Sequence, residues 1–372
     1  MSTGFTERDD LAMRRALELA ARGLETTDPN PRVGCVIVRG ERIVGEGWHE
    51  RAGEPHAEVI ALRAAGSEAE GATAFVTLEP CSHHGRTPPC VDALIAARIG
   101  RVVYAIQDPN PLVRGRGAER LRAAGIGVDS GLLRECAAEL NEGFIKRMQH
   151  GKPFVRLKLA MSLDGRTALA NGTSQWITGE AARADVQRWR ARSSAVLTGI
   201  GTVLADDPRL TVRQAAAGSR PPLRVVLDSA LRTPPSARLF DSPGEVLIFT
   251  SSADAERRAA LEARGARVER LDASEGPHST LEHVLARLAA AEVNEVLVEA
   301  GATLAGAMVR ARLADELLLY MAPVLLGPQA RALLTLPELT ELAASWKFHI
   351  VETRQLDEDL RLRLRPRATP AA

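Results

Sequence analysis

Short apolar runs and longer amphipathic segments alternate along the chain. Runs such as Ala74-Phe75-Val76-Thr77-Leu78 have the length of a buried strand, whereas the longer segments repeat apolar residues every three or four positions, as helices do. Strands that alternate with helices predict a three-layer α/β domain with at least partly parallel strands. Over the first part of the chain the pattern predicts helices at 11–22, 57–66, 89–98, 116–124 and 132–148, and strands at 33–39, 42–48, 74–78, 101–106 and near 128.

A change of pattern near Gly151-Lys152-Pro153 indicates a domain boundary, because a helical segment ends before it and an apolar, strand-like run follows it. A chain of 372 residues is also long for one hydrophobic core. We therefore expect an α/β protein of two domains, at 1–150 and 151–366, with a loose tail at 367–372. In the second domain the pattern predicts helices at 179–192, 279–291 and 302–312, and strands at 154–161, 195–199, 224–228, 245–250, 267–271, 295–299 and from 315.

Composition narrows the functional classes. Hydrophobic residues make up 45% of the chain and charged residues 26%, as in ordinary globular proteins, and the net charge is +1. So small a net charge produces no long-range attraction to nucleic acid or to an acidic membrane. Only 3% of the residues are aromatic, so few side chains can stack on bases. Four cysteines form no disulfide framework, and neither a signal-type segment nor a membrane-spanning run is visible. We expect a cytoplasmic protein that binds neither nucleic acid nor membrane.

The candidate chemistry of the first domain lies between His56 and Cys90. His56 and Glu58 form an H-x-E motif, Cys81 follows a proline, and Cys90 follows nine positions later. One imidazole and two thiolates suit Zn²⁺, and three protein ligands leave a position open for water. Zinc lowers the pKa of bound water, and the carboxylate of Glu58 can move its proton to a departing amine. We expect His56 at the entry to one helix and Cys81 at the start of a second.

This motif differs from the zinc-deaminase pattern H-x-E and P-C-x-x-C, because eight residues separate the two cysteines. The longer loop carries Arg86 and two histidines, which can add contacts to a charged substrate. The alternative is a structural zinc site, closed by His83 or His84 as a fourth ligand.

Further polar positions lie at the ends of predicted strands. Asn30 can act as a clamp on a base edge or simply form a turn, and the same two roles are open for Asp108-Pro109-Asn110-Pro111. In the second domain, the small-residue turn at Gly301 opens a predicted helix whose N-terminus suits a pyrophosphate. Ser174, Arg190 and Arg213 could converge on a phosphate monoester, although a solvated helix face would also explain Arg190.

Together these motifs resemble the bifunctional deaminase–reductases of riboflavin biosynthesis over nearly the whole chain. The motifs that carry the resemblance are Asn30-Pro31-Arg32-Val33-Gly34, Ala52-Gly53-Glu54-Pro55-His56-Ala57-Glu58, Glu79-Pro80-Cys81-Ser82-His83-His84-Gly85-Arg86-Thr87-Pro88-Pro89-Cys90, Asp108-Pro109-Asn110-Pro111, Ser162-Leu163-Asp164-Gly165, Ser174-Gln175-Trp176-Ile177-Thr178, Leu204-Ala205-Asp206-Asp207-Pro208 and Glu299-Ala300-Gly301. The resemblance implies a cytidine-deaminase-like three-layer α/β/α domain followed by a dihydrofolate-reductase-like α/β domain.

The resemblance also implies two reactions. The first is the zinc-dependent deamination of 2,5-diamino-6-ribosylamino-4(3H)-pyrimidinone 5′-phosphate. The second is reduction of the ribosyl chain by NADPH, which gives 5-amino-6-ribitylamino-uracil 5′-phosphate. Members of the family are usually homo-oligomers.

By position, the resemblance assigns zinc to His56, Cys81 and Cys90 and proton transfer to Glu58. It assigns the pyrimidine nucleotide to Asn30, His49, Arg86, Asp108 and Asn110. It assigns the substrate of the reductase to Lys158, Ser174, Thr178, Arg190, Leu210, Arg213 and Glu299. It assigns NADPH to Ala160, Trp176, Thr202, Asp206, Ser229, Gly301, Ala302, Thr303, Leu304, Ala305, Gly306 and Ala307.

Two rival functions remain open from the sequence. One is a nucleic-acid base deaminase with an appended nucleotide-binding domain. The other is a non-catalytic zinc scaffold with a nucleotide-sensing domain, against which the intact Glu58 argues.

Overall fold

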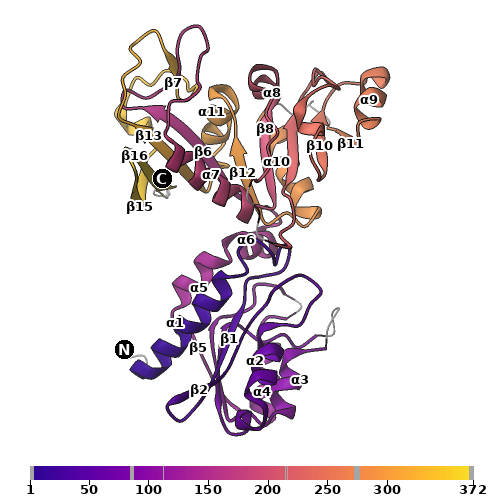
Figure 1. The fold of residues 1–372 in the computed structure, drawn as a ribbon, viewed down its shortest axis with the longest axis vertical. Helices are drawn as coiled ribbons and strands as arrows, with labels where there is room; N and C mark the ends of the chain where they lie inside the picture. Colours follow the sequence, from indigo (N-terminus) through magenta and orange to yellow (C-terminus); the bar gives the residue numbers. More distant parts are fainter. Residues whose placement is uncertain are drawn as a thin grey trace. The chain divides into compact units, whose positions relative to one another are not determined.

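The computed structural model describes residues 4–83, 88–111, 113–213, 215, 217–271 and 277–367. The chain forms two compact units (Figure 1). One comprises Met1–Lys152 with Ala216–Arg220, and the other comprises Pro153–Ala215 with Pro221–Ala372. No helix in the described ranges combines the length and the apolar character that crossing a membrane requires.

In the first unit the sheet order is β2-β1-β3-β4-β5. β1 pairs antiparallel with both β2 and β3, whereas β3, β4 and β5 are parallel. The elements are α1 (Glu7–Ala21), β1 (Gly34–Arg39), β2 (Arg42–Trp48), α2 (Ala57–Ala65), a 3-10 turn (Gly66–Ala69), β3 (Thr73–Leu78), α3 (Cys90–Ala96), β4 (Arg101–Ile106), α4 (Arg116–Ala123), β5 (Gly127–Ser130), α5 (Arg134–Leu140) and α6 (Glu142–His150).

Successive side chains of β1 point to opposite faces of the sheet, and helices cover both faces, which gives this unit three layers. Cys35 and Ile37 are buried in a cluster with alanines of α2, whereas Val36 points to the opposite face and packs with Met13 of α1. Helix α1 lies so close to the sheet that a Cβ on Gly34 would stand 1.9 Å from a backbone oxygen of the helix. The expected three-layer α/β/α arrangement is confirmed.

One predicted helix, at 132–148, is wrong, because α5 and α6 are separate helices that meet at Asn141. The Asn141 side chain accepts a hydrogen bond from the Arg32 backbone N–H at 2.8 Å and donates to the Arg32 carbonyl at 2.9 Å. A short amide side chain that pairs with distant backbone competes with helical hydrogen bonding, which accounts for the break.

In the second unit the sheet order is β11-β10-β9-β8-β12-β6-β13-β16-β15. The strands from β11 to β13 in this order are parallel, and β16 and β15 add antiparallel pairs. The elements are β6 (Phe154–Ser162), β7 (Arg166–Ala168), α7 (Glu180–Arg192), β8 (Ala195–Gly199), α8 (Ile200–Asp206), β9 (Leu223–Leu227), a 3-10 turn (Arg238–Phe240), β10 (Val246–Thr250), α9 (Ala255–Glu262), β11 (Ala266–Arg270), α10 (Pro277–Ala290), β12 (Glu295–Glu299), α11 (Ala302–Arg310), β13 (Glu316–Ala322), β14 (Arg331–Ala332), a 3-10 turn (Leu342–Ala344), β15 (Phe348–Leu356) and β16 (Asp359–Pro366). The pattern of apolar residues did not predict α8 or α9.

Helices cover both faces of this sheet. On one face, Val296 and Val298 of β12 pack in a cluster with residues of α10 and α11. On the other face, Leu297 packs with Trp189 of α7 and Tyr320 of β13. The expected second α/β domain is confirmed.

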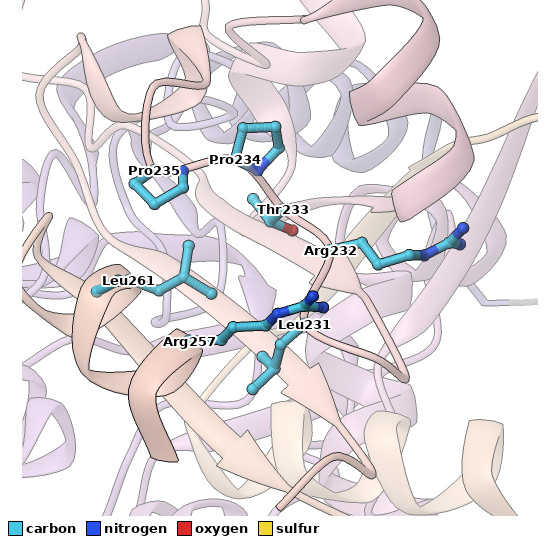
Figure 2. Close-up of a pocket in the computed structure, with 8 residues that line it drawn as sticks. Leu231, Arg232, Thr233, Pro234, Pro235, Arg257 and Leu261 are labelled. Carbon is cyan, nitrogen blue, oxygen red and sulfur yellow. The ribbon is translucent and has the colours of Figure 1, made fainter. Parts of the chain in front are cut away.

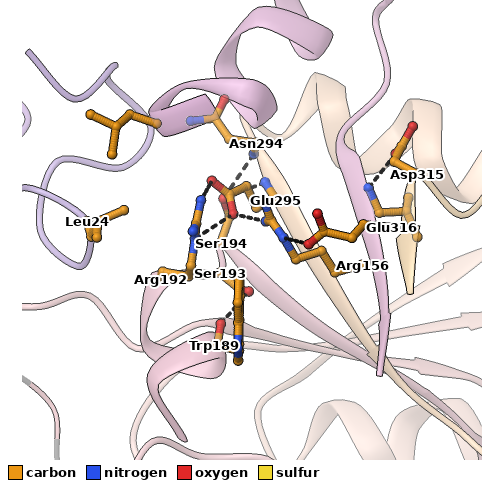
Figure 3. A network of polar contacts seen from close by, with 12 residues as sticks. Leu24, Arg156, Trp189, Arg192, Ser193, Ser194, Asn294, Glu295, Asp315 and Glu316 are labelled. Atoms are coloured by element: carbon orange, nitrogen blue, oxygen red, sulfur yellow. Dashed lines mark hydrogen bonds and ion pairs between the residues drawn. The ribbon is translucent and has the colours of Figure 1, made fainter. Parts of the chain in front are cut away.

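A buried ion network lies beside Trp189 (Figure 3). Arg156 of β6 is 1% exposed and contacts Glu295 of β12 and Glu316 of β13, which flank it in the sheet. Arg192 donates to Glu295 at 3.1 Å, and the guanidinium carbons of Arg156 and Arg192 both lie 5.1 Å from the Trp189 ring centroid. Burying a charged group at this depth is costly unless opposite charges or hydrogen bonds compensate it, and here each acid contacts at least two cations.

Candidate functional sites

The topology of the first unit brings its functional candidates to one edge of the sheet. Because β1 is antiparallel to β3, the start of β1 lies beside the carboxyl end of β3. The end of β2 reaches the same edge, since Gly34 pairs with Trp48. Segments far apart in sequence therefore meet there, and they carry Asn30, His49, His56, Cys81 and Asp108.

His56, Cys81 and Cys90 form a cluster whose ligand atoms all lie within 4.8 Å of one another. Tetrahedral zinc places pairs of nitrogen and sulfur ligands about 3.5–3.8 Å apart. The Nδ1 atom of His56 lies 3.6 Å from the Cys81 sulfur and 3.0 Å from the Cys90 sulfur, so the second pair is about half an ångström closer than that spacing. The donor set therefore fits zinc, and the distance from His56 to Cys81 matches the spacing that zinc imposes.

His56 is the N-cap of α2, as expected from its motif, and Glu58 lies buried in the first turn of that helix. The expected helix start at Cys81 is wrong, because α3 begins at Cys90. The backbone N–H of Cys90 instead donates to the Cys81 sulfur at 3.3 Å. The hydrogen bond with the Cys90 side chain, helped by His56, lowers the pKa of Cys81, which favours the thiolate form that a metal ligand needs.

No fourth ligand side chain joins this cluster among the residues that the structure describes. His83, one of the two candidates for closing the site, is exposed. The other candidate, His84, and the predicted substrate residue Arg86 lie outside the described residues.

His49 is buried between the metal cluster and Asn30. Its ring centroid lies 5.3 Å from that of His56, with the two rings nearly perpendicular. Nδ1 of His49 faces the Pro55 carbonyl at 3.2 Å and therefore donates, so Nε2 accepts from the Asn30 amide at 3.0 Å. Burial lowers the pKa of His49, which favours this neutral tautomer.

Asp108 and Asn110 follow β4, and the Asp108 carboxylate accepts the Asn110 backbone N–H at 2.8 Å. Asp108 is only 7% exposed. Burial, together with the negative charges of Glu79 and Cys81, raises the pKa of Asp108 to about 7. The Asp108 carboxyl group is therefore shielded from solvent, at the same edge of the sheet as the metal cluster.

Three charged side chains, which we call the charged group, lie together in the second unit: Lys158, Arg190 and Glu299. Arg190 of α7 makes two contacts with Glu299, at 2.5 and 2.9 Å, and donates to the Thr211 carbonyl at 2.9 Å. Lys158 of β6 is the neighbour of Glu299 in the parallel pairing. Although burial opposes it, the charges of Arg190 and Lys158 lower the pKa of Glu299, so this carboxylate is ionised at neutral pH.

This group lies at the topological switch point of the sheet. The chain passes from β6 to β8 and outward to β11, and β12 then fills the gap between β8 and β6. In open parallel sheets, ligands bind outside the carboxyl ends of the strands at such a point. Glu299 ends β12, and Gly301 is the N-cap of α11 without a side-chain capping bond, so the first amides of that helix suit a pyrophosphate.

The other predicted dinucleotide residues take several positions. Ala160 lies in β6, Thr202 and Asp206 lie in α8 after β8, and Ser229 follows β9. Within 301–307, Ala305 and Gly306 are buried, and a Cβ on Gly306 would stand 2.2 Å from the Thr335 carbonyl oxygen. At these two positions α11 therefore packs closely against its surroundings, with Gly306 beside the backbone of Thr335.

The predicted convergence of Ser174, Arg190 and Arg213 on a phosphate is not visible as a contact. In the described part of the chain, no hydrogen bond or ion pair joins the three side chains. Arg213 is exposed and uses its backbone N–H to contact Gln187 at 2.9 Å.

The segment from Ser174 to Thr178 holds the remaining predicted contacts. Trp176 is 64% exposed, and the guanidinium carbon of Arg183 lies 4.6 Å from its ring centroid. Arg183 also donates to the Thr178 carbonyl at 2.6 Å. Leu210, by contrast, is buried, with a backbone φ of 53°.

A cavity of about 340 Å³ lies beside the carboxyl end of β9 (Figure 2). It is lined by Leu231, Arg232, Thr233, Pro234, Pro235, Arg257, Ala260 and Leu261. Arg257 donates to the Ala230 carbonyl at 3.2 Å, next to Ser229. The sequence does not predict this cavity.

The sequence also does not predict a role for Glu79, which follows β3, or for Thr198 of β8. The Thr198 hydroxyl donates to the Glu299 carbonyl at 2.7 Å.

The folds and their sites define a class of protein, a cytidine-deaminase-type zinc enzyme joined to an α/β reductase. The family model for the cytidine and deoxycytidylate deaminase zinc-binding region matches residues 6–106, and that for the RibD C-terminal domain matches residues 153–362. The chain belongs to the RibD family of bifunctional deaminase–reductases in riboflavin biosynthesis, and its cofactors are zinc and NADPH.

Relatives match over nearly the whole length. The riboflavin biosynthesis protein RibD of Escherichia coli is 51% identical over 96% of this chain and 99% of its own, and that of Mycobacterium tuberculosis is 44% identical over 92% and 94%. Among solved structures, Acinetobacter baumannii RibD is 47% identical, with a TM-score of 0.91 over 97% of this chain and 99% of its own.

The Thermotoga maritima diaminohydroxyphosphoribosylaminopyrimidine deaminase/5-amino-6-(5-phosphoribosylamino)uracil reductase is 36% identical, with a TM-score of 0.86 over 96% of this chain and 99% of its own. These comparisons support the bifunctional enzyme and not the nucleic-acid base deaminase.

Proposed function

We propose that residues 1–150 deaminate the diaminopyrimidinone ribosyl phosphate and that residues 151–366 reduce the ribosyl chain of the product. The observation that carries the first half is the cluster of His56, Cys81 and Cys90 with Glu58 buried beside it. We assign zinc to the three ligands and proton transfer to Glu58. Three ligands leave a coordination position for water, as a hydrolytic site requires.

When bound, zinc supplies ionised water at neutral pH. Glu58 takes a proton from the attacking water and delivers it to the leaving nitrogen, which departs as ammonia. Asn30 and His49 hold one side of the pyrimidine, and Asp108 and Asn110 hold the other. The hydrogen bond between Asn30 and His49 supports this assignment, because it fixes the His49 tautomer at the edge of the site. Arg86, outside the described residues, belongs to the same substrate set by its motif.

For the reductase we assign substrate binding to the charged group of the second unit and to its neighbours. NADPH supplies a hydride to the first carbon of the ring-opened ribosyl chain. The chain itself must fix that carbon against the nicotinamide. The rigid Arg190–Glu299 pair supports this role, since a bidentate ion pair holds both side chains in one geometry. The proposed substrate residues are Lys158, Ser174, Thr178, Arg190, Leu210, Arg213 and Glu299.

We assign NADPH to the carboxyl ends of β6, β8, β9 and β12. The uncapped start of α11 supports binding of the pyrophosphate there. The proposed residues are Ala160, Trp176, Thr202, Asp206, Ser229 and the segment 301–307.

We further propose that the protein is a homo-oligomer in the cytoplasm and binds neither nucleic acid nor membrane. None of the four cysteines, which all lie within the described residues, forms a disulfide, and this supports a reducing compartment. Light scattering tests the oligomeric state, and cell fractionation tests the compartment and the absence of membrane binding.

The decisive experiment gives the zinc-loaded protein the diaminopyrimidinone phosphate, with and without NADPH. We expect ammonia release in both reactions and oxidation of NADPH only after deamination. A protein that contains zinc but releases no ammonia would refute the deaminase assignment. NADPH that stays reduced in the presence of the deaminated intermediate would refute the reductase assignment.

A further inference from the structure

Glu79 is a buried acid without a role in the chemistry described above. It lies between the end of β3 and Cys81 and is 2% exposed. A carboxylate at this depth needs hydrogen bonds to replace those it would make with water. The donors are three backbone amides: Asp108 and Gly115 donate to Oε2 at 3.2 and 3.0 Å, and Ala118 donates to Oε1 at 3.2 Å.

All three donors belong to the segment that follows β4, which carries Asp108 and Asn110. The contact is close on the backbone side as well. A Cβ on Gly117 would stand 2.1 Å from the Pro80 carbonyl oxygen, so only glycine fits there without a shift. Glu79 and Pro80 thus fasten this segment to the strand end that delivers Cys81.

We propose that Glu79 is a positioning residue of the deaminase, which fixes Asp108 and Asn110 relative to the metal cluster. The inference rests on the proposed function, because the substrate contacts of Asp108 and Asn110 are part of it. The Asn110 backbone N–H donates to the Asp108 carboxylate at 2.8 Å, so the two residues are held in one turn. A hydrogen bond to the Asp108 amide therefore orients both side chains.

The arrangement requires a carboxylate. Both oxygens of Glu79 accept N–H bonds, whereas glutamine would place an NH₂ group against at least one amide donor. Two facing donors repel each other and leave an amide unsatisfied in a buried place. We expect Glu79→Gln to displace the segment without removing any ligand of the metal.

The test measures deaminase kinetics, zinc content and the reductase reaction on the same preparations. For Glu79→Gln we expect KM for the pyrimidine substrate to rise about tenfold or more, with kcat changed within about threefold. The dissociation constant of the deaminated product at the deaminase site, from calorimetry, should rise by a similar factor, whereas its binding at the reductase site should not change. Zinc content and NADPH oxidation with the deaminated intermediate should remain at the wild-type level.

Two further variants separate positioning from folding. Glu79→Gln combined with Asn110→Ala should raise KM by less than the product of the two single effects, because part of the effect of Glu79 acts through Asn110. Glu70→Gln is the matched control, since Glu70 is an exposed acid that pairs with Arg98 and precedes β3 at its other end. Gly117→Ala, which pushes the segment away while Glu79 stays, should also raise KM.

A Glu79→Gln enzyme with wild-type KM and product affinity would overturn the inference, and so would independent, multiplicative effects in the double variant. Loss of zinc and of both activities would overturn it in favour of a folding role. If wild-type protein itself releases no ammonia, it is the proposed function that fails.

Discussion

Replacing Arg156 tests whether the buried ion network stabilises the second unit. Arg156 contacts both Glu295 and Glu316, and all three side chains are at most 1% exposed. Removing one partner of a buried pair typically costs about 3–5 kcal/mol, because a charge is left without compensation. Here each acid keeps another cation: Arg192 lies 3.1 Å from Glu295, and Arg363 lies 2.9 Å from Glu316.

We therefore expect Arg156→Met to reduce the free energy of unfolding of the second unit by about 3 kcal/mol, at the lower end of that range. Arg192→Met removes a cation that is 16% exposed and leaves Glu295 with Arg156, so about 1.5 kcal/mol is expected. Arg98→Met is the surface control, because the Arg98–Glu70 pair is exposed on both sides and should change stability by less than about 1 kcal/mol.

The assay must report on the second unit alone, because a protein of two units need not unfold in one step. Hydrogen exchange in increasing urea, read on peptides from β6, β12 and β13, provides this measurement. Arg156→Met with a stability within about 1 kcal/mol of wild type would refute the reasoning. It would mean that methionine packing replaces the network without net cost, as other buried ion pairs allow.

Four further predictions concern the two sites and the network. Glu58→Gln should keep zinc but lose deamination, which metal analysis and ammonia release check together; retained turnover would remove Glu58 from its role. A chelator should abolish ammonia release and leave NADPH oxidation with the deaminated intermediate intact, and loss of both would contradict a metal requirement confined to the deaminase. Arg213→Ala should mainly raise the KM of the reductase for its substrate, and a fall in kcat at unchanged KM would contradict a binding role. Although burial opposes it, the charges of Arg156 and Arg363 lower the pKa of Glu316, so this stabilisation is present at neutral pH. The stabilisation from these ion pairs should be lost as the pH falls below 4.5, the ordinary pKa of a glutamate. In Arg156→Met, the free energy of unfolding should therefore fall less steeply with pH over this range than in the wild type.

The sequence predicted most strands because a buried strand needs little more than a short apolar run. It did not predict the break between α5 and α6, since the partner of Asn141 is Arg32, 109 positions away. The same limit applies to Arg156. In the run that begins at Phe154 its charge indicates a solvent-facing position, but its acidic partners come from strands 139 and 160 positions further along the chain.

The two sites differ in how far a motif can reveal them. The metal cluster is visible in sequence because all its ligands come from one stretch of the chain, and because the H-x-E spacing places His56 and Glu58 in a single helical turn. The reductase group draws Lys158, Arg190 and Glu299 from β6, α7 and β12, which only the strand order brings together. No local spacing encodes that order, so the residues alone left Arg190 open between a phosphate ligand and a solvated face. The structure shows a contact that neither alternative included, because Arg190 forms a bidentate ion pair with Glu299, more than a hundred positions away in the sequence.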